Sequence, residues 1–374
     1  MKEGICLAAQ QIKALITAGK LTGSIQESQI QPASFEPTLG NEVYILDVET
    51  KGIFRPQADK TILHTLLELP ERQRKKVDIT NGFEIKKGFT YLFPLNERLS
   101  LSDTEYIKSS AKSSLGRLFV NVRLLSDFNP SFDEIHHSYK SNSELHLWLL
   151  VQPLTFNLIV HPGIALNQLR FFKGHDAQLT PSETLNECSQ QPFLYVQEKG
   201  TFVPAKPIVI DGVQIHLDLS GVHTRGISAF RARENPFPID LKKLNEYEAE
   251  HYFEPILGST REITIKKGEH YLLVSKEYFK IPSHLNAELK PHSHIALRGP
   301  LHFAGFIDNG FEGYLVFEVR SDEISDMVLS DGMPISKIDI YRTEKTDKPY
   351  GEAIGSNYFK QTGVRLSKYF KSAF

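Results

Sequence analysis

The segment AKSSLGRLFVNV, residues 111–122, places cations and hydroxyl groups beside an apolar stretch. Lys112 and Arg117 are the cations, and Ser113 and Ser114 supply the hydroxyls. Such groups bind phosphate oxygens through charge-assisted hydrogen bonds. The pattern therefore indicates an anion site. Its alternative is a solvated, serine-rich loop in which Arg117 forms a surface ion pair.

A carboxylate occupies an unusual position in AGFIDNGFEGYLVFEV, residues 304–319. After a turn at residues 307–310, an alternating strand is predicted in which Glu318 stands between Phe317 and Val319. Such a glutamate is either an exposed edge residue or a buried acid with a raised pKa. A raised pKa allows a glutamate to carry protons near neutral pH.

The tail KPYGEAIGSNYFKQTGVRLSKYF, residues 348–370, combines aromatic and polar side chains with little capacity to form a core. Tyr350, Tyr358 and Gln361 are its most conspicuous members. Such a terminus is either a lid that folds over a ligand or a disordered end.

The sequence contains an internal repeat. Residues 85–92 read IKKGFTYL and residues 265–272 read IKKGEHYL, and each copy predicts a turn followed by a strand. The offset between the two copies also pairs Leu39 of ASFEPTLG with Leu219 of QIHLDLSG. This period is too long for a repeat array, so a duplicated domain is predicted.

Short strands separated by Gly, Pro, Asn and Asp predict an all-β fold, with a barrel or clip in each half. The halves are assigned to residues 1–180 and 181–374, with a polar connector over residues 173–207. Two helices are expected, over residues 8–18 and 241–251.

The bulk composition excludes several classes of protein. A net charge of −2 gives no global attraction to nucleic acid or anionic membranes. The longest apolar stretch, residues 145–160, is interrupted by polar residues and falls short of the roughly 20 residues of a membrane span, so it predicts two buried strands. Two cysteines without a CxxC pair and no signal peptide indicate a cytoplasmic protein.

The motifs also exclude one kind of metal chemistry. Zinc-dependent nucleobase deaminases need an HxE motif and a PCxxC motif, and the sequence contains neither. The histidine pairs at residues 136–137 and 292–294 lack a third ligand at useful spacing. No metal site held by the protein is therefore predicted.

Together the motifs resemble the dCTP deaminases, relatives of the dUTPases, and in particular the double-length members. The resemblance implies two tandem dUTPase-like β-clips, or distorted jelly-roll barrels, with a few short helices. The matching residues are Gln31, Pro32, Ser34, Leu39 and Gly40 in the first motif, Lys112, Ser113, Ser114 and Arg117 in the second, Ile307, Asp308, Gly310, Phe311, Gly313 and Glu318 in the third, and Tyr350, Tyr358, Gln361 and Gly363 in the tail.

The chain departs from the family pattern at several positions. Glu36 stands where Asp is usual, and Lys112 where Arg is usual. Phe306 replaces a common arginine, Asn309 a proline, and Asn357 a phosphate-binding lysine.

The two halves divide the family's motifs between them. The first keeps SSLGR, but its counterpart of the catalytic strand, SELHLWLLVQPL, is apolar where a glutamate would fall. The second keeps Glu318 and the tail, but aligns Leu297 with Arg117. In the family, the serine and arginine of one subunit project into the site that holds the glutamate of its neighbour. The resemblance thus implies a site at an interface between an N-terminal and a C-terminal half.

The activity implied is hydrolytic deamination of dCTP to dUTP and ammonia, without a metal-bound hydroxide. Glu318 would act as general acid and base. Ser113 and the backbone carbonyl of Ala304 would orient the water, and Arg117 would stabilise the arrangement.

The resemblance also implies the ligands. Mg²⁺ is expected on the triphosphate, held by phosphate oxygens and water, and zinc is not. The expected partners are dCTP and dUTP, dTTP as an inhibitor, and further copies of the chain in a homo-oligomer, without nucleic acid or membrane. The residues expected to bind the substrate are Lys112, Ser114, Ala304, Ile307, Asp308, Tyr350, Tyr358 and Gln361.

Two other functions stay open at this point. One is a nucleotide pyrophosphatase of the dUTPase kind, or a bifunctional enzyme that continues to dUMP. The other is a non-catalytic, nucleotide-binding regulator on the same fold, which is favoured only by the altered residues Phe306, Asn309 and Asn357.

Overall fold

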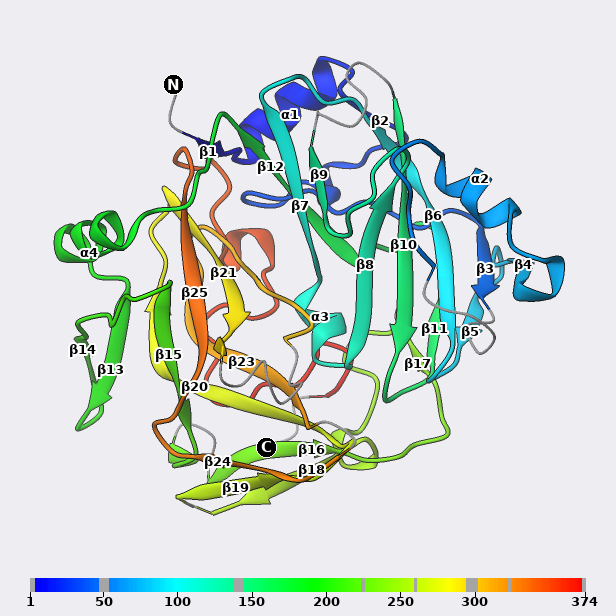
Figure 1. Cartoon of the computed structure of the whole chain (residues 1–374). Helices are drawn as coiled ribbons and strands as arrows, with labels where there is room; N and C mark the ends of the chain where they lie inside the picture. Colours follow the sequence, from blue (N-terminus) through cyan, green and yellow to red (C-terminus); the bar gives the residue numbers. More distant parts are fainter. Residues whose placement is uncertain are drawn as a thin grey trace. The chain divides into compact units, whose positions relative to one another are not determined.

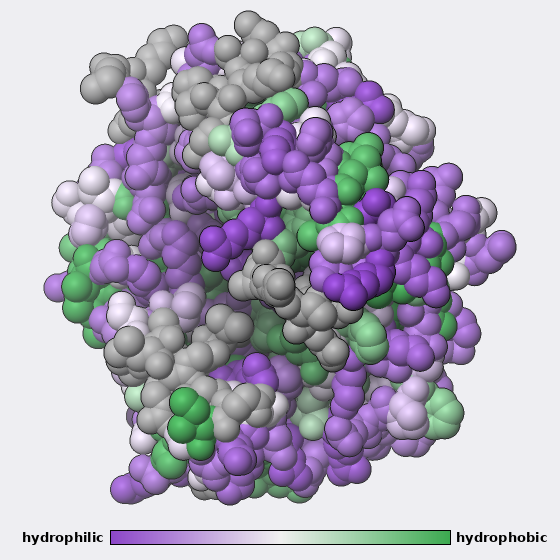
Figure 2. Space-filling view, turned by 45° about the vertical axis from the view of Figure 1, so that its right-hand side comes forward, coloured by the Kyte–Doolittle hydropathy of each residue, from purple (hydrophilic) through white to green (hydrophobic). Residues whose placement is uncertain are grey.

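Strands dominate the protein, as Figure 1 shows, and the expected all-β class is confirmed. The surface seen in Figure 2 is mainly hydrophilic, with apolar side chains in small separate groups. The computed structural model describes residues 4–46, 54–136, 144–222, 226–258, 261–293, 302–321 and 324–371.

The chain folds as two compact units. Unit 1 comprises residues 1–177 and 236–244, and unit 2 comprises residues 178–235 and 245–374. A short segment from the second half of the sequence therefore belongs to unit 1.

Unit 1 is built on three sheets, with the strand orders β1-β12-β7-β9, β4-β3-β6-β10-β8 and β17-β11-β5. Its elements are β1 (Ile5–Cys6), α1 (Ala9–Thr17), β2 (Leu21–Thr22), β3 (Glu42–Leu46), α2 (Ile62–Leu67), β4 (Arg74–Asp78), β5 (Phe83–Ile85), β6 (Thr90–Leu99), β7 (Glu105–Ala111), α3 (Ser113–Gly116), β8 (Val120–Ser126), β9 (Glu134–His136), β10 (Leu145–Pro153), β11 (Leu158–Val160), β12 (Asn167–Lys173) and β17 (Ile239–Asp240).

Unit 2 has a large sheet with the order β14-β13-β20-β15-β25-β21-β22, to which β16, β18 and β23 are joined, and a small sheet of β19 and β24. Its elements are α4 (Pro181–Gln190), β13 (Leu194–Glu198), β14 (Thr201–Pro204), β15 (Val213–Asp218), β16 (Ile227–Ala232), β18 (Phe253–Leu257), β19 (Glu262–Ile265), β20 (His270–Lys280), β21 (Leu285–Pro291), β22 (Phe306–Ile307), β23 (Glu312–Arg320), β24 (Met327–Ser330) and β25 (Pro334–Arg342).

The repeated octapeptide forms the same structure in both units. It ends one strand, turns, and begins the long strand β6 or β20. Gly88 and Gly268 turn the chain at φ values of 83° and 70°, which glycine adopts without steric cost. The hydroxyls of Tyr91 and Tyr271 accept a hydrogen bond from the backbone N–H of the first lysine in each repeat, at 2.8 and 3.3 Å. The duplication is therefore present in the structure as well as in the sequence.

The offset between the two octapeptides does not extend to the first motif. Leu39 is bridged to Leu95 in unit 1, whereas Leu217 is paired with Ser275 in unit 2. Leu95 and Ser275 are related by the octapeptide offset, so the residues that pair with them, Leu39 and Leu217, are equivalent in the two units. The predicted alignment of Leu39 with Leu219 is therefore wrong. The segments between the first motif and the repeated turn differ in length by two residues.

Three local predictions have definite outcomes. The helix over residues 8–18 forms as α1, and the apolar stretch over residues 145–160 forms the strands β10 and β11. The connector predicted over residues 173–207 is wrong for most of its length, because α4 and the hairpin of β13 and β14 form there. In the described part of the chain, no helix has the length and apolar character to cross a membrane.

The helix predicted over residues 241–251 is wrong. Asp240 accepts a hydrogen bond from the backbone N–H two residues later at 3.0 Å and contacts His161 at 2.9 Å, so the expected cap forms a tight turn after β17 instead. Tyr247 then pairs with Phe370 in a parallel bridge. Pairing with the distant tail outweighs the local helical spacing.

Candidate active site

The second motif is folded into unit 1 between β7 and β8, where α3 lies in Figure 1. Lys112 precedes the short helix α3 and Arg117 follows it. Ser114 and Arg117 are buried, with 3% and 4% of their surface exposed, whereas Lys112 and Ser113 are half-buried. The alternative of a solvated loop is therefore wrong for this motif.

Two of the residues that depart from the family pattern, Glu36 and Lys112, are in contact. The ammonium of Lys112 forms an ion pair with a carboxylate oxygen of Glu36, and the two side chains are 19% and 15% exposed. The first motif and the second motif are thus joined directly within unit 1.

Sequence analysis missed Glu97, which holds the first motif in place. This fully buried carboxylate accepts hydrogen bonds from the backbone N–H and the hydroxyl of Thr38, both at 2.8 Å, and from the amide of Gln29 at 2.6 Å. In unit 2 Glu277 accepts in the same way from the backbone N–H of His216 at 3.0 Å. A signal existed, because Glu97 and Glu277 are related by the same offset as the repeated turns.

The third motif carries Glu318 on β23 of unit 2. The side chains of Leu315, Phe317 and Val319 belong to the apolar core of the unit, as the alternation predicts. Glu318 lies on the opposite face of the strand and is only 2% exposed. The burial of this carboxylate is therefore confirmed, and its interpretation as an exposed edge residue is wrong.

The strand register identifies the counterpart of Glu318 in unit 1. Glu318 on β23 is paired with Leu272 on β20, and Leu150 on β10 is paired with Leu92 on β6. Leu92 and Leu272 are equivalent members of the repeated octapeptide. Leu150 therefore occupies the position of Glu318, which confirms that unit 1 is apolar where unit 2 carries the carboxylate.

The turn before β23 is fixed from two sides. Asn309, which is fully buried, donates a side-chain hydrogen bond to the carbonyl of Ser283 at 3.0 Å, and its own carbonyl accepts from the backbone N–H of Tyr350 at 2.8 Å. Ala304 and Ile307 are buried. The backbone at position 309 thus connects the turn to the tail, and the asparagine side chain connects it to Ser283.

Asp308 and Phe306 flank Ile307 in this turn. Asp308 is half-buried, so part of its side chain can be reached by a ligand. Phe306, which replaces a common arginine, is buried. Asn357, in contrast, is exposed on the tail.

The tail folds onto unit 2. The side-chain amide of Gln361 donates to the carbonyl of Tyr314, and the backbone N–H of Tyr314 donates to the carbonyl of Gln361 at 3.2 Å. Tyr358 is buried, and its backbone N–H donates to the hydroxyl of Tyr350 at 3.1 Å. The alternative of a disordered end is wrong for the described part of the tail.

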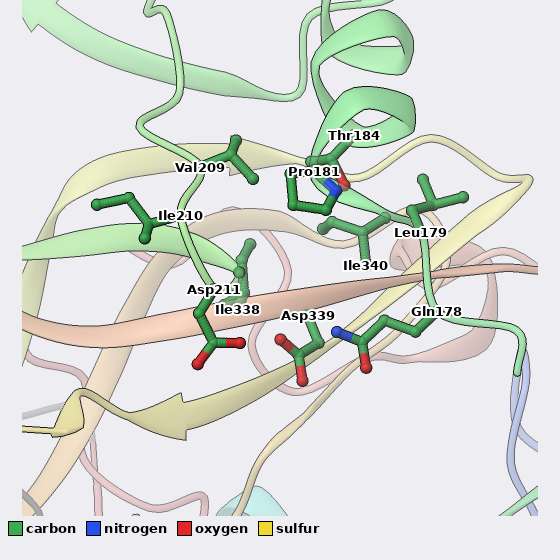
Figure 3. Close-up of a pocket in the computed structure, with 11 residues that line it drawn as sticks. Gln178, Leu179, Pro181, Thr184, Val209, Ile210, Asp211, Ile338, Asp339 and Ile340 are labelled. Atoms are coloured by element: carbon green, nitrogen blue, oxygen red, sulfur yellow. The ribbon is translucent and has the colours of Figure 1, made fainter.

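Neither of two hollows in the units is lined by the predicted catalytic residues. One, of about 80 Å³, lies in unit 2 between the start of α4, the segment before β15, and β25, and Figure 3 shows Gln178, Asp211 and Asp339 at its polar side. The other, of about 390 Å³, is an open hollow in unit 1 that includes Gly40 of the first motif.

The predicted residues are therefore distributed over the two units. Of the predicted catalytic and substrate-binding residues, Lys112, Ser113, Ser114 and Arg117 lie in unit 1, whereas Glu318 and the others lie in unit 2. Leu297, which aligns with Arg117, lies outside the described residues, as do the second histidines of the two pairs. Within the described ranges, no group of three or more His, Cys, Asp or Glu side chains is arranged to hold a metal ion.

Two family models match consecutive parts of the chain. The model of the 2'-deoxycytidine 5'-triphosphate deaminase N-terminal domain matches residues 2–175, and the model of the C-terminal domain of this deaminase matches residues 187–370. Together they span both units.

Curated relatives match a shorter part of the chain. A dUMP-forming dCTP deaminase of Nanoarchaeum equitans is 27% identical over 129 residues, which is 34% of this chain and 65% of that protein. A dUMP-forming dCTP deaminase of Corynebacterium glutamicum is 32% identical over 130 residues, which is 34% of this chain and 68% of that protein. The first alignment thus spans slightly less than two thirds of the relative's length.

A solved structure matches nearly the whole fold. The crystal structure of 2'-deoxycytidine 5'-triphosphate deaminase from Agrobacterium tumefaciens has a TM-score of 0.82 and 28% sequence identity to this chain. The match covers 92% of this chain and 100% of that one, so the double-length architecture is shared.

Proposed function

The chain belongs to the family of 2'-deoxycytidine 5'-triphosphate deaminases, and we propose that it hydrolyses dCTP to dUTP and ammonia. The observation that carries the proposal is the buried carboxylate of Glu318, on β23, at the position where unit 1 has Leu150. A buried glutamate is costly to keep unless it serves a purpose, and only one unit has kept it.

Glu318 would act as both general base and general acid. It takes one proton from water while the water oxygen bonds to C4 of cytosine, and it delivers this proton to N3. It then takes the second proton from the hydroxyl now on C4 and delivers it to the 4-amino group. The C4–N4 bond then breaks and ammonia leaves. One dCTP and one water thus give one dUTP and one ammonia.

Arg117, Ser113 and Ala304 would assist this step. Ser113 and the carbonyl of Ala304 orient the water, and the guanidinium of Arg117 stabilises charge at the reacting centre. The burial of Arg117 supports this role, because a buried charge interacts more strongly than a solvated one. Since Arg117 and Glu318 lie in different units, the proposal assigns one site to residues from both.

The remaining residues would bind the nucleotide. Lys112 and Ser114 contact the phosphates, Ile307 and Asp308 the deoxyribose side, and Tyr350, Tyr358 and Gln361 belong to the tail that covers the substrate. Mg²⁺ bound to the triphosphate would neutralise part of its charge. We further propose a cytoplasmic homo-oligomer that dTTP inhibits.

A bifunctional reaction is the second candidate. Both relatives described above are named dUMP-forming dCTP deaminases, and an enzyme of that kind also releases pyrophosphate. A direct assay decides between the two reactions.

The test is incubation of the purified chain with dCTP and Mg²⁺, with ammonia, dUTP, dUMP and pyrophosphate measured together. Ammonia with dUTP is the expected result. Ammonia with dUMP and pyrophosphate would establish the bifunctional reaction. Pyrophosphate without ammonia, or tight binding of dCTP without any product, would overturn the deaminase proposal in favour of a pyrophosphatase or a regulator.

A further inference from the structure

Two departures from the family pattern are in contact in unit 1. Glu36 replaces an aspartate of the first motif, Lys112 replaces an arginine of the second, and the two side chains form an ion pair. Glutamate is longer than aspartate by one methylene, whereas lysine reaches less far than arginine by about one atom. Relative to the family pattern, the two changes thus alter the side-chain lengths in opposite directions, and the combined reach of the pair stays nearly the same.

The backbone of Glu36 is held by hydrogen bonds to Gln29. The backbone N–H of Glu36 donates to the carbonyl of Gln29 at 2.8 Å, and the side-chain amide of Gln29 donates to the carbonyl of Glu36 at 3.1 Å. That amide also donates to the buried carboxylate of Glu97 at 2.6 Å. The backbone of Glu36 is thus held in place, and its carboxylate restrains a lysine side chain that is otherwise flexible.

Unit 2 shows that the fold itself does not need this ion pair. The backbone N–H of His292 donates to the carbonyl of Ile335 at 3.1 Å, as that of Lys112 does to Leu166 at 3.1 Å, so the two positions are equivalent. The side-chain amide nitrogen of Gln214 lies 3.4 Å from Nε2 of His292. The same framework therefore forms with an amide and an imidazole in place of a carboxylate and an ammonium group.

We propose that Glu36 is a positioning residue that directs the ammonium of Lys112 toward the triphosphate of the substrate. This inference rests on the proposed function. A lysine ammonium has three N–H donors, so one can bind Glu36 while the others bind phosphate oxygens. Of the two equivalent positions, only the one in the unit that keeps SSLGR has the ion pair. The ion pair is therefore assigned to substrate binding and not to folding of the unit.

The experiment is a double-mutant cycle with Glu36→Asp, Lys112→Arg and the variant that carries both. Each single change alters the combined reach, so each is expected to raise KM for dCTP by about tenfold with kcat little changed. The double variant restores the reach and should return KM to within about threefold of the original. Isothermal titration with dCTP and with deoxycytidine measures binding independently of turnover.

Gln214→Asn is the matched control, because it removes one methylene at the equivalent position of unit 2. It should leave KM and dCTP affinity unchanged. Deoxycytidine affinity should be unchanged in every variant, since the nucleoside lacks phosphates. Thermal unfolding of each variant identifies any that fails to fold, and Glu36→Gln, which keeps the side-chain length, then replaces Glu36→Asp and should weaken dCTP binding alone.

Effects of the two single changes that simply multiply in the double variant would overturn the inference, because a coupled pair is not additive. Equal losses for dCTP and deoxycytidine would also overturn it and would indicate a structural role. Failure of the proposed function is distinct, since it would appear as dCTP binding without ammonia release in the unmodified protein, while the titrations still report the coupling.

Discussion

At the scale of single residues, Glu318 and Leu150 distinguish the two units most sharply. They occupy equivalent positions in strand pairs that share the repeated octapeptide. Leucine at this position only fills space, whereas a buried carboxylate retains a titratable group at a cost in solvation free energy. The difference supports a catalytic role for unit 2 and a structural one for the corresponding strand of unit 1.

Glu318→Gln should lower kcat for dCTP deamination by about 10² to 10⁴, because glutamine cannot carry a proton. Binding of dCTP should be largely kept, since glutamine has nearly the same shape. Steady-state ammonia release and isothermal titration measure the two properties. Glu262→Gln, at an exposed position on β19, is the control and should have normal activity. Normal turnover in Glu318→Gln would refute the assignment.

His216 provides a prediction about pH and stability. Its hydrogen bond to Glu277, at 2.6 Å, raises its pKa above the ordinary value. A raised pKa in the folded state means that the pair stabilises the protein fully below the unfolded pKa of about 6.5. This stabilisation is lost as the pH rises through the folded pKa. The unmodified protein should therefore lose thermal stability over that range.

The matched comparison is His216→Thr, since Thr38 occupies the equivalent position in unit 1 and binds Glu97 through its hydroxyl. Threonine does not titrate, so the difference in Tm between the two proteins should shrink with rising pH. A difference that does not depend on pH would exclude the His216 and Glu277 pair as its cause.

At the scale of elements, the tail is bound to β23 as an added strand segment. Gly313 pairs with Gln361 in a parallel bridge at a φ of 147°, a value that favours glycine. A Cβ atom at Gly313 would lie 3.1 Å from the backbone nitrogen of Gln361. The contact between the tail and the strand that carries Glu318 thus requires a residue without a side chain at position 313.

Gly313→Ala should weaken tail docking by about 1–3 kcal/mol, through backbone strain and crowding. Limited proteolysis should cut the tail faster, and KM for dCTP should rise if the tail covers the substrate. Gly355→Ala tests the strain alone, because Gly355 also has a positive φ but no atoms near its Cβ position. Unchanged proteolysis of the tail in Gly313→Ala would contradict this account.

At the scale of the whole molecule, the duplication lets one chain keep two specialised copies of a unit. Unit 1 keeps the cations and hydroxyls of the second motif, and unit 2 keeps the carboxylate and the tail. Under the proposed function one site draws on residues of both units, so neither unit needs a complete set.

Arg117→Ala and Glu318→Gln should each lower deamination strongly, and the chain with both changes should be little worse than the poorer single variant. Residues that act as a unit are not additive, because losing one removes the benefit of the other. Steady-state ammonia release measures this. Losses that multiply in the double variant would contradict a shared site. Mixing the two single variants then locates the site, since recovery of activity requires that it form between chains.

The sequence alone determined the all-β class, the duplication, and the motif residues that unit 1 and unit 2 each keep. These features are local, since alternation, turn glycines and motif spacing are properties of neighbouring residues. The apolar counterpart of Glu318 could also be inferred from the sequence, because the repeated octapeptide sets the register of the strands. Glu97 could have been found from the same offset.

Only the tertiary structure decided the burial of Glu318, the ion pair of Glu36 with Lys112, and the lack of an α-helix over residues 241–251. Each depends on residues that are distant in the sequence, such as the bridge from Tyr247 to Phe370. Local pattern and propensity are worth only tenths of a kcal/mol per residue, about 0.2 to 0.7, and burial with strand pairing outweighs them. Contacts of that kind are set by the folded chain as a whole.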